Sequence, residues 1–296
     1  MNRNIIRALR LPFLSASILP FIFGSLINRA NFNFSGFILG LITVAATHLS
    51  ANLINDYADS KSGADWQDNN FYEFFGGSKL IQEKVFSEKF YLKTAIFFAV
   101  ISSICIIILS VVLKSLLVLG LSIAIVFLSW SYSKSPLRFS YRRLGEVIIF
   151  LLFGPALVMG GYFIQTKVFP SLMSFLLSLP FGLLTTAILF ANEIPDFNED
   201  RNAGKFTWVS LVGSKWAFLI YYALIIFALL SISLNIYLKF LNPLALFCFV
   251  CIFPVLKAGN ILKEHYSDKK RLMKSSKLTI AVQTCISIIL ILVVLL

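Results

Sequence analysis

The segment Phe34–Ile54 reads FSGFILGLITVAATHLSANLI and leads directly into Asn55-Asp56-Tyr57-Ala58-Asp59. It carries no charged residue and is about as long as the roughly 20 apolar residues that a helix needs to cross a bilayer. The acidic residues begin where the apolar run ends. The stretch therefore predicts a membrane-spanning helix that brings carboxylates to a membrane surface.

The rest of the chain has the composition of a membrane protein. Only 14% of its 296 residues are charged, against roughly 25% in soluble domains, and the mean hydropathy is +0.85. Helices are expected because lipid cannot satisfy an unpaired backbone and the apolar runs lack the alternation of barrel strands. We predict an all-α integral membrane protein, a single domain over residues 1–296, with nine transmembrane helices. They are expected at Leu11–Ile27, Phe34–Ile54, Phe90–Leu113, Leu116–Tyr132, Leu144–Ile164, Leu172–Ala191, Trp216–Leu238, Phe240–Leu256 and Leu278–Leu296.

The basic residues predict the orientation of these helices. When the N-terminus is placed in the cytoplasm, all of the 26 Lys and Arg residues except Arg29, Lys114, Lys167 and Lys239 fall on the cytoplasmic side. The C-terminus is then outside. We take the plasma (inner) membrane of a bacterium as the default location.

The formal charge of +12 does not require a nucleic acid, because basic loops that face an anionic leaflet account for it. The run Lys263–Lys277 is expected to bind anionic lipid in this way, and no protein partner is predicted. Cys248 and Cys251 form a CxxC motif, but neither a second pair nor a nearby His supports a zinc site.

The acidic residues are unevenly distributed. All 14 Asp and Glu residues fall on the predicted cytoplasmic side, and most lie in two segments, Asp56–Glu88 and Glu193–Asp200. The second segment follows the sixth apolar run and reads Asn192-Glu-Ile-Pro-Asp196-Phe-Asn-Glu-Asp200. Each cluster thus begins where a predicted helix reaches the cytoplasmic surface.

The two clusters resemble each other. Asn55 and Asp59 are four residues apart, as are Asn192, Asp196 and Asp200, and this spacing stacks side chains on one face of a helix. The repeat predicts two similar four-helix halves with a site between them at the cytoplasmic end. Carboxylates at this spacing repel, so a bound cation is expected. Mg²⁺ suits such a site because it prefers oxygen ligands and bridges to phosphate oxygens. Solvated loops and a metal-free ion pathway remain as alternatives.

These motifs resemble those of a known family. Asn55–Asp59 and Asn192–Asp200 are similar to the two signature motifs of UbiA-type prenyltransferases. The segment Tyr132–Arg138, with the following Gly145-Glu146, and the N-terminal Arg10-Leu-Pro12 also resemble that family, and the likeness extends over nearly the whole chain. It implies Mg²⁺-dependent transfer of a polyprenyl group from its diphosphate to an aromatic acceptor.

Within that superfamily, the chain looks most like the dihydroxynaphthoate prenyltransferases of menaquinone biosynthesis. The segments Asp56–Asp65, Gly76–Ser87 and Asp200–Thr207 carry this resemblance. Lys79 departs from it, since Arg is common there, and so does Gly77, where Pro is common. The resemblance implies 1,4-dihydroxy-2-naphthoate as the acceptor, prenylated at the carbon that bears its carboxylate, with another phenolic or lipid acceptor as the alternative.

The resemblance also implies roles for individual residues. We expect the diphosphate to be held through Mg²⁺ by four carboxylates, those of Asp56, Asp59, Asp196 and Asp200. Tyr132 is expected to stabilise the allylic cation, because aromatic faces attract cations. The expected substrate-binding residues are Asn55, Asn192, Asp65, Lys79, Arg138 and Lys205.

Other classes of protein remain possible from the sequence. A secondary transporter also uses internal repeats and polar sites in the membrane, but those sites lie near the midplane and not at one surface. A catalytically inactive accessory subunit is a second alternative. His48 lies one helical turn before Asn52 and could line the acceptor pocket or be structural.

Overall fold

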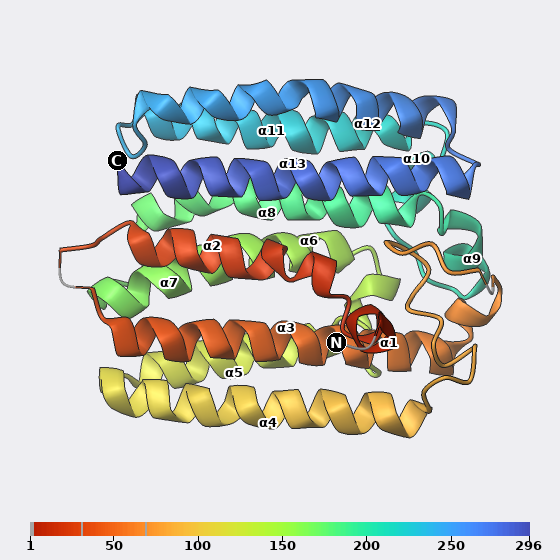
Figure 1. The fold of residues 1–296 in the computed structure, drawn as a ribbon, viewed down its shortest axis with the longest axis horizontal. Helices are drawn as coiled ribbons and strands as arrows, with labels where there is room; N and C mark the ends of the chain where they lie inside the picture. The colour runs from red at the N-terminus through yellow and green to blue at the C-terminus, as the bar shows by residue number, and fades with distance from the viewer. Residues whose placement is uncertain (1–2, 31, 69) are drawn as a thin grey trace.

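The computed structural model describes residues 3–30, 32–68 and 70–296, and Figure 1 shows that these form a bundle of nearly parallel helices. The predicted all-α chain is confirmed, since no strand occurs among the described residues. The longer helices are α2 (Ser15–Leu26), α3 (Phe34–Ser62), α4 (Glu88–Leu113), α5 (Leu116–Ser131), α7 (Leu157–Thr166), α8 (Leu172–Glu193), α11 (Ala217–Tyr237), α12 (Ile252–Glu264) and α13 (Lys269–Leu295). Shorter segments are α1 (Arg3–Ala8), η1 (Leu11–Phe13), η2 (Ala64–Trp66), η3 (Phe139–Tyr141), α6 (Gly145–Leu151), η4 (Leu152–Ala156), α9 (Phe197–Asn202), α10 (Val209–Val212) and η5 (Pro243–Cys251).

Seven helical stretches of the described chain are long and apolar enough to cross a membrane. Two further predicted spans correspond to shorter apolar helices, Leu11–Leu26 and Leu116–Ser131. The eighth run was expected to end at Leu256, before Lys257, but the helical stretch is Pro243–Glu264. One lysine therefore does not end the helix, because Lys at a membrane interface can extend its ammonium group to the polar region.

Polar side chains define the ends of these helices. Asn33 caps α3, Ser87 caps α4, Ser171 caps α8 and Asp268 caps α13, each by accepting a hydrogen bond from a backbone N–H three residues later. At the other end of α3, Gly63 adopts φ 85°, a left-handed conformation that glycine tolerates well. These caps fix where each helix begins and where α3 delivers its acidic residues.

Figure 1 shows α3, α4 and α5 at one edge of the bundle, α11, α12 and α13 at the other, and α2, α6, α7 and α8 between them. The helices approach closely at small residues. A Cβ on Gly24 would collide with the backbone of Val158, and one on Gly154 would lie 2.8 Å from the Cα of Gly182. The C-terminus lies at the end opposite α9 and the loop after α3, which gather at one end of the bundle.

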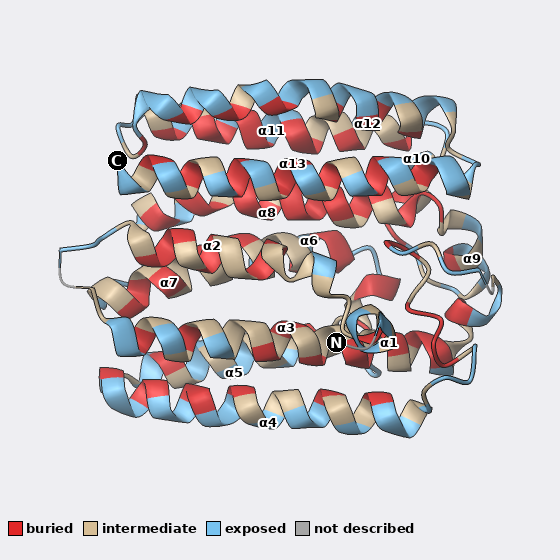
Figure 2. Ribbon diagram, viewed as in Figure 1, coloured by how far each residue is buried: buried red, intermediate tan, exposed pale blue. Residues whose placement is uncertain are grey.

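The outer surface of the bundle is apolar. Phe97, Phe227 and Phe253 are among the most exposed large side chains, and Figure 2 shows exposed residues along the outer faces of α4, α11 and α12. Many polar side chains are buried instead, including those of Asp56, Asp59 and Asp200. Such an arrangement is suited to lipid outside and a polar site inside.

Candidate functional site

A cavity of about 330 Å³ lies inside the bundle. Its apolar end is formed by residues such as Phe21, Gly40, Leu109 and Ile164, and its polar end lies where α3 and α8 end. Nine of the eleven site residues predicted from the sequence line it. They are Asn55, Asp59, Asp65, Lys79, Tyr132, Asn192, Asp196, Asp200 and Lys205.

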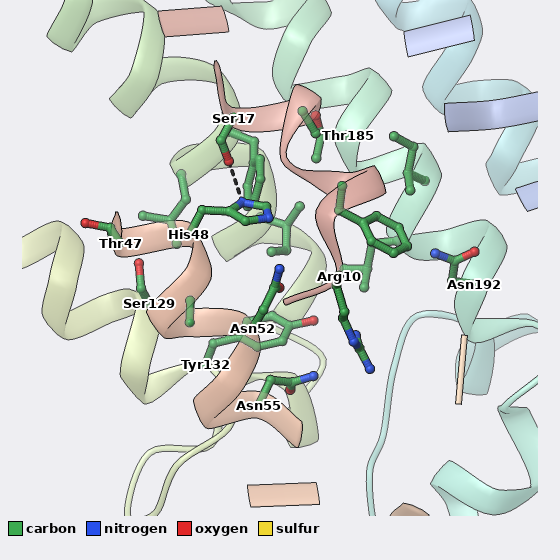
Figure 3. A pocket seen from close by; sticks show the side chains of 18 of the residues that line it. Arg10, Ser17, Thr47, His48, Asn52, Asn55, Ser129, Tyr132, Thr185 and Asn192 are labelled. Atoms are coloured by element: carbon green, nitrogen blue, oxygen red, sulfur yellow. Dashed lines mark hydrogen bonds between the residues drawn. The ribbon is translucent and has the colours of Figure 1, made fainter. Parts of the chain in front are cut away.

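The first acidic motif lies on α3, as its spacing predicts. The helix continues to Ser62, so Asn55 and Asp59 share one face and both border the cavity. Asp59 accepts a hydrogen bond from the Tyr141 hydroxyl at 2.9 Å, and Asn55 accepts one from the hydroxyl of Ser133. Figure 3 shows Asn55, Asn52 and Tyr132 on the same side of the pocket.

Asp56 does not line the cavity with the other acids. Its side chain is only 2% exposed and forms an ion pair with Arg10 at 2.7 Å, while the Ser78 N–H donates to its other oxygen at 3.2 Å. Arg10 does line the cavity. Asp56 and Asp59 are only three positions apart in the sequence, but they have different partners in the structure.

The second motif is not on one continuous helix, contrary to the prediction from its four-residue spacing. The helix α8 ends at Glu193, Asp196 lies in a turn, and α9 begins at Phe197. Pro195 accounts for the break, because proline has no N–H for the helical hydrogen bond and disfavours helix before it. The turn nevertheless leaves Asn192, Asp196 and Asp200 on the cavity wall.

Two contacts connect the second motif with basic and backbone groups. The Gly76 N–H donates to Asp196 at 2.9 Å, and the Lys205 ammonium lies 3.3 Å from Asp200. Burial raises the pKa of Asp200 to about 7: the charges of Asp196 and Asp59 add to this, and Lys205 opposes it. Burial alone would lower the pKa of Lys205, but Asp200 and Asp59 raise it well above its usual value. Lys205 is thus a permanent cation in this site.

Lys79 and Asp65 form a second buried charged group. The Lys79 ammonium donates to the Asp65 backbone carbonyl at 2.7 Å and lies 3.6 Å from its carboxylate. Burial, followed by the charges of Asp59 and Asp56, raises the pKa of Asp65 to about 8. Gly77 is needed here, because it has φ 76° and a Cβ would lie 2.5 Å from the Asp65 carboxylate.

Arg138 lies outside the cavity, although the resemblance implies a phosphate contact. Its guanidinium stacks 3.5 Å from the centre of the Tyr141 ring, whose hydroxyl donates to Asp59. The structure therefore connects Arg138 to the site through Tyr141. Tyr132 borders the cavity directly.

Five charged residues that line the cavity were not predicted from the sequence to belong to the site: Arg10, Asp68, Glu193, Glu199 and Lys269. Lys269 of α13 donates to Asp68 at 2.9 Å and to Glu199 at 2.8 Å, which ties the loop after α3 to α9. This contact lowers the pKa of Asp68 to about 2, although burial opposes the shift. Glu193 is directly adjacent to Asn192, and Arg10 begins the segment Arg10-Leu-Pro12 that the resemblance covers, so the sequence carried a signal at these two positions.

The donor atoms suit a divalent cation that is also held by a phosphate group. Oδ2 of Asp200 and Oδ1 of Asn192 are buried and accept no hydrogen bond from the described residues. Among those residues, no three His, Cys, Asp or Glu side chains converge to form a metal site by themselves. Mg²⁺ commonly uses one or two carboxylates together with substrate phosphates, so the residues fit this mode of binding.

Several known proteins are similar to this chain in sequence. The model of the UbiA prenyltransferase family matches residues 17–281. UbiA prenyltransferase domain-containing protein 1 of Dictyostelium discoideum is 32% identical over 257 residues, which cover 82% of this chain and 75% of that protein. The human protein of the same name is 28% identical over 201 residues, which cover 65% of this chain and 55% of the human protein. The 1,4-dihydroxy-2-naphthoate octaprenyltransferase of Escherichia coli (strain K12) is 31% identical over 187 residues, 60% of this chain and 57% of that enzyme.

Solved structures share the fold. A UbiA homolog from Aeropyrum pernix K1, in its apo form, has a TM-score of 0.75 at 18% identity and covers 97% of this chain and 99% of its own. A UbiA homolog from Archaeoglobus fulgidus, bound to GPP and Mg²⁺, has a TM-score of 0.59 at 14% identity, with 98% and 100% covered. At these identities the likeness concerns the fold alone.

Proposed function

Because this chain belongs to the UbiA prenyltransferase family, we propose that it transfers a polyprenyl group from its diphosphate to 1,4-dihydroxy-2-naphthoate with the help of Mg²⁺. The chain is a prenyltransferase embedded in a membrane. The observation that carries the proposal is the meeting of two acidic motifs, on α3 and after α8, at one end of a single cavity. An apolar compartment continues from that end, as the binding of a diphosphate that carries an isoprenoid tail requires.

The acceptor is the more specific part of the proposal. The segments Asp56–Asp65 and Gly76–Ser87 support dihydroxynaphthoate through their resemblance to that branch, and the similarity to the E. coli enzyme supports it too. The Dictyostelium and human relatives carry a name that states the domain and no acceptor. Asp59 lies within one turn of the end of α3, which supports an enzyme over a transporter.

The reaction begins with cleavage of the allylic carbon–oxygen bond. We place the diphosphate among Asp59, Asp196 and Asp200, which would hold Mg²⁺, with Asn55 and Asn192 orienting the group. When bound, Mg²⁺ would stabilise the negative charge that develops on the leaving diphosphate. Lys205 and Lys79 contribute fixed positive charge at the same end of the cavity, and preorganised charges of this kind favour the transition state.

The chain then positions the cation and the acceptor. Tyr132 borders the cavity and offers its ring face to the allylic cation, an interaction that contributes roughly 0.5–2 kcal/mol. The electron-rich ring carbon of the acceptor forms the new bond to C1 of the prenyl group, and the acceptor releases its carboxylate as CO₂. Diphosphate leaves with the electron pair of the broken bond.

The topology is also a proposal. We infer nine membrane crossings in a single domain with two similar halves, in which Leu11–Leu26 and Leu116–Ser131 also cross. A 16-residue helix is about 24 Å long, so these two cross only if the bilayer thins or if the residues that flank them extend the span. The N-terminus and the site then face the cytoplasm, and the C-terminus lies outside a plasma membrane.

The test is a transfer assay on the purified protein in nanodiscs. Radiolabelled farnesyl or longer prenyl diphosphate, Mg²⁺ and 1,4-dihydroxy-2-naphthoate should give a prenylated product. EDTA and the substitution Asp59→Ala should abolish it, whereas Glu83→Gln should not, because Glu83 pairs with Arg7 away from the cavity. If hydroxybenzoate is prenylated and the naphthoate is not, the proposed acceptor is wrong. If the folded protein binds the diphosphate but prenylates neither acceptor, the aromatic class itself is wrong.

A further inference from the structure

A set of polar side chains lies in the cavity beyond the acidic end. His48, Asn52, Asn55 and Asp59 follow at steps of four, three and four residues, so they share one face of α3, and all line the cavity. His48 lies about 16 Å from Asp59 along the helix axis. It is therefore too deep to contact a diphosphate held at Asp59, and the mechanism above gives it no role.

The His48 ring is fixed with one nitrogen free. Its Nδ1 lies 2.6 Å from the hydroxyl of Ser17 on α2, and its ring packs edge-on to Phe153 at 5.8 Å. The other nitrogen, Nε2, is buried and has no hydrogen-bond partner among the described residues, and the side chain is 7% exposed. A buried polar atom without a partner is unfavourable, which favours a ligand that supplies one.

A second buried polar atom without a hydrogen-bond partner lies on the facing helix, α8. Thr185 of α8 lines the cavity, is 6% exposed, and its hydroxyl has no partner among the described residues. It precedes Asp196 by the same number of residues as His48 precedes Asp59, so it occupies the equivalent place in the repeat. Figure 3 shows Thr185 across the pocket from His48. The Nδ2 atom of Asn52, on the His48 side, is also buried without a partner.

We propose that His48, Asn52 and Thr185 bind the oxygen substituents of the aromatic acceptor, a subsite that rests on the proposed function. A prenyl tail has no hydrogen-bonding atom, so it cannot satisfy these three groups. A ring with hydroxyl and carboxylate substituents can. The Asn52 amide donates, the Thr185 hydroxyl donates or accepts, and His48 Nε2 accepts from a hydroxyl when Nδ1 carries the proton.

This placement also explains how the two substrates are kept apart. The diphosphate lies at the charged end, near Lys205, and the acceptor is held by neutral donors and acceptors deeper in the cavity. Tyr132 lies beside the pocket between Asn52 and Asn55 (Figure 3). The reacting carbons are thereby brought together near the aromatic ring that we assign to the allylic cation.

The test measures whether His48 recognises one oxygen of the acceptor. Transfer is followed in nanodiscs with farnesyl diphosphate, Mg²⁺ and three acceptors: 1,4-dihydroxy-2-naphthoate, 1-hydroxy-2-naphthoate and 4-hydroxy-2-naphthoate. We expect His48→Phe and Thr185→Val each to lower kcat/KM for the dihydroxy acceptor roughly tenfold, the usual effect of one hydrogen bond. With the analogue that lacks the hydroxyl bound by His48, the loss caused by His48→Phe should largely disappear. The KM for farnesyl diphosphate should stay within about twofold.

The matched control is Ser129→Ala. Ser129 also lines the cavity, but its hydroxyl already donates to the Ile125 carbonyl at 2.8 Å, so its removal should leave the acceptor kinetics unchanged. The subsite is wrong if His48→Phe lowers kcat/KM by the same factor with all three acceptors. It is also wrong if His48→Phe raises the KM for farnesyl diphosphate by as large a factor.

Two further outcomes separate this inference from the proposed function. If His48→Phe does not fold, the wild-type protein alone decides, because equal kcat/KM for the three acceptors would overturn the subsite. If the wild-type protein prenylates no aromatic acceptor, the proposed function fails and the subsite fails with it. If the wild-type protein transfers the prenyl group and a folded His48→Phe variant has unchanged kinetics, the subsite alone is wrong.

Discussion

The backbone N–H of Gly76 donates to Oδ2 of Asp196 at 2.9 Å, which joins the loop after α3 to the turn after α8. These segments carry or follow the two acidic motifs, so one backbone contact connects both halves of the site. An N–H donor also favours the charged form of the carboxylate, which partly offsets the effect of burial on the pKa of Asp196.

The first prediction concerns the charge of Asp196. The substitution Asp196→Asn retains an oxygen that can accept from Gly76 but removes the negative charge. We expect kcat to fall about 10²–10³-fold, the usual effect of removing one electrostatic contact, while thermal stability is retained. Transfer assays and melting curves measure the two effects, with Glu83→Gln as the control. A variant with nearly wild-type kcat would show that Asp196 does not act through its charge.

The second prediction concerns the ion pair of Arg10 and Asp56. Removing the guanidinium leaves a carboxylate that is 2% exposed without its cation, and breaking a buried pair costs about 3–5 kcal/mol. We therefore expect Arg10→Met to lower the melting temperature strongly and Asp56→Asn in the same chain to restore part of it. Melting curves of both single variants and the double variant complete the cycle. Additive losses would mean that the two groups do not stabilise each other.

The third prediction is the pH dependence of the ligand-free protein. Burial and neighbouring acids raise the pKa of Asp65 to about 8 and that of Asp200 to about 7, against an ordinary value near 3.9. Between the ordinary pKa and the raised one, each of these carboxyl groups is protonated in the folded chain but ionised in the unfolded chain. The free energy of unfolding therefore falls as pH rises through this range. We expect the melting temperature to fall from about pH 5 to about pH 8, and Asp65→Asn to reduce the upper part of that decline. A melting temperature that rises over this window would contradict the assignment.

The features that could be predicted from the sequence depend on neighbours along the chain. The apolar runs and the step from Asn55 to Asp59 are local, so they predicted helices and one face of α3. The spacing of Asn192, Asp196 and Asp200 likewise predicted one helix, and this prediction was wrong because Pro195 breaks the helix. A turn still brings all three side chains of the second motif to the cavity wall, so only the structure distinguishes this turn from a continuous helix.

The features that could not be predicted join residues that are far apart. The pairing of Arg10 with Asp56 depends on how α1, η1 and α3 pack, and no periodicity in the sequence indicates it. Lys269 lies in the run Lys263–Lys277, which was expected to bind lipid, yet its ammonium contacts Asp68 and Glu199. A count of charges predicts which side of the membrane a lysine faces, but not which carboxylate it meets.

The fourth prediction concerns the contacts of Lys269. The substitution Lys269→Met removes two ion pairs that hold the loop after α3 and α9 together at the cavity. Partly exposed pairs contribute about 0.2–1 kcal/mol each, so we expect the KM for prenyl diphosphate to rise a few-fold and amide exchange in residues 70–80 to accelerate. Lys270→Met is the control, because that neighbouring side chain is exposed. Equal behaviour of both variants would exclude a specific role for Lys269.

The last prediction concerns the apolar end of the cavity. Gly160 of α7 lines it, and a Cβ built there meets no atom within 4 Å, so a larger side chain fits but takes up cavity space. We expect Gly160→Leu to lower kcat/KM for long prenyl diphosphates at least roughly tenfold more than for short ones, since only a long tail reaches that end. Gly120→Leu is the matched control: Gly120 is also unobstructed, but it is exposed on α5 and does not line the cavity. Competition between geranyl and longer prenyl diphosphates in one assay measures the preference directly. If Gly160→Leu leaves that preference unchanged, the tail does not occupy this end of the cavity.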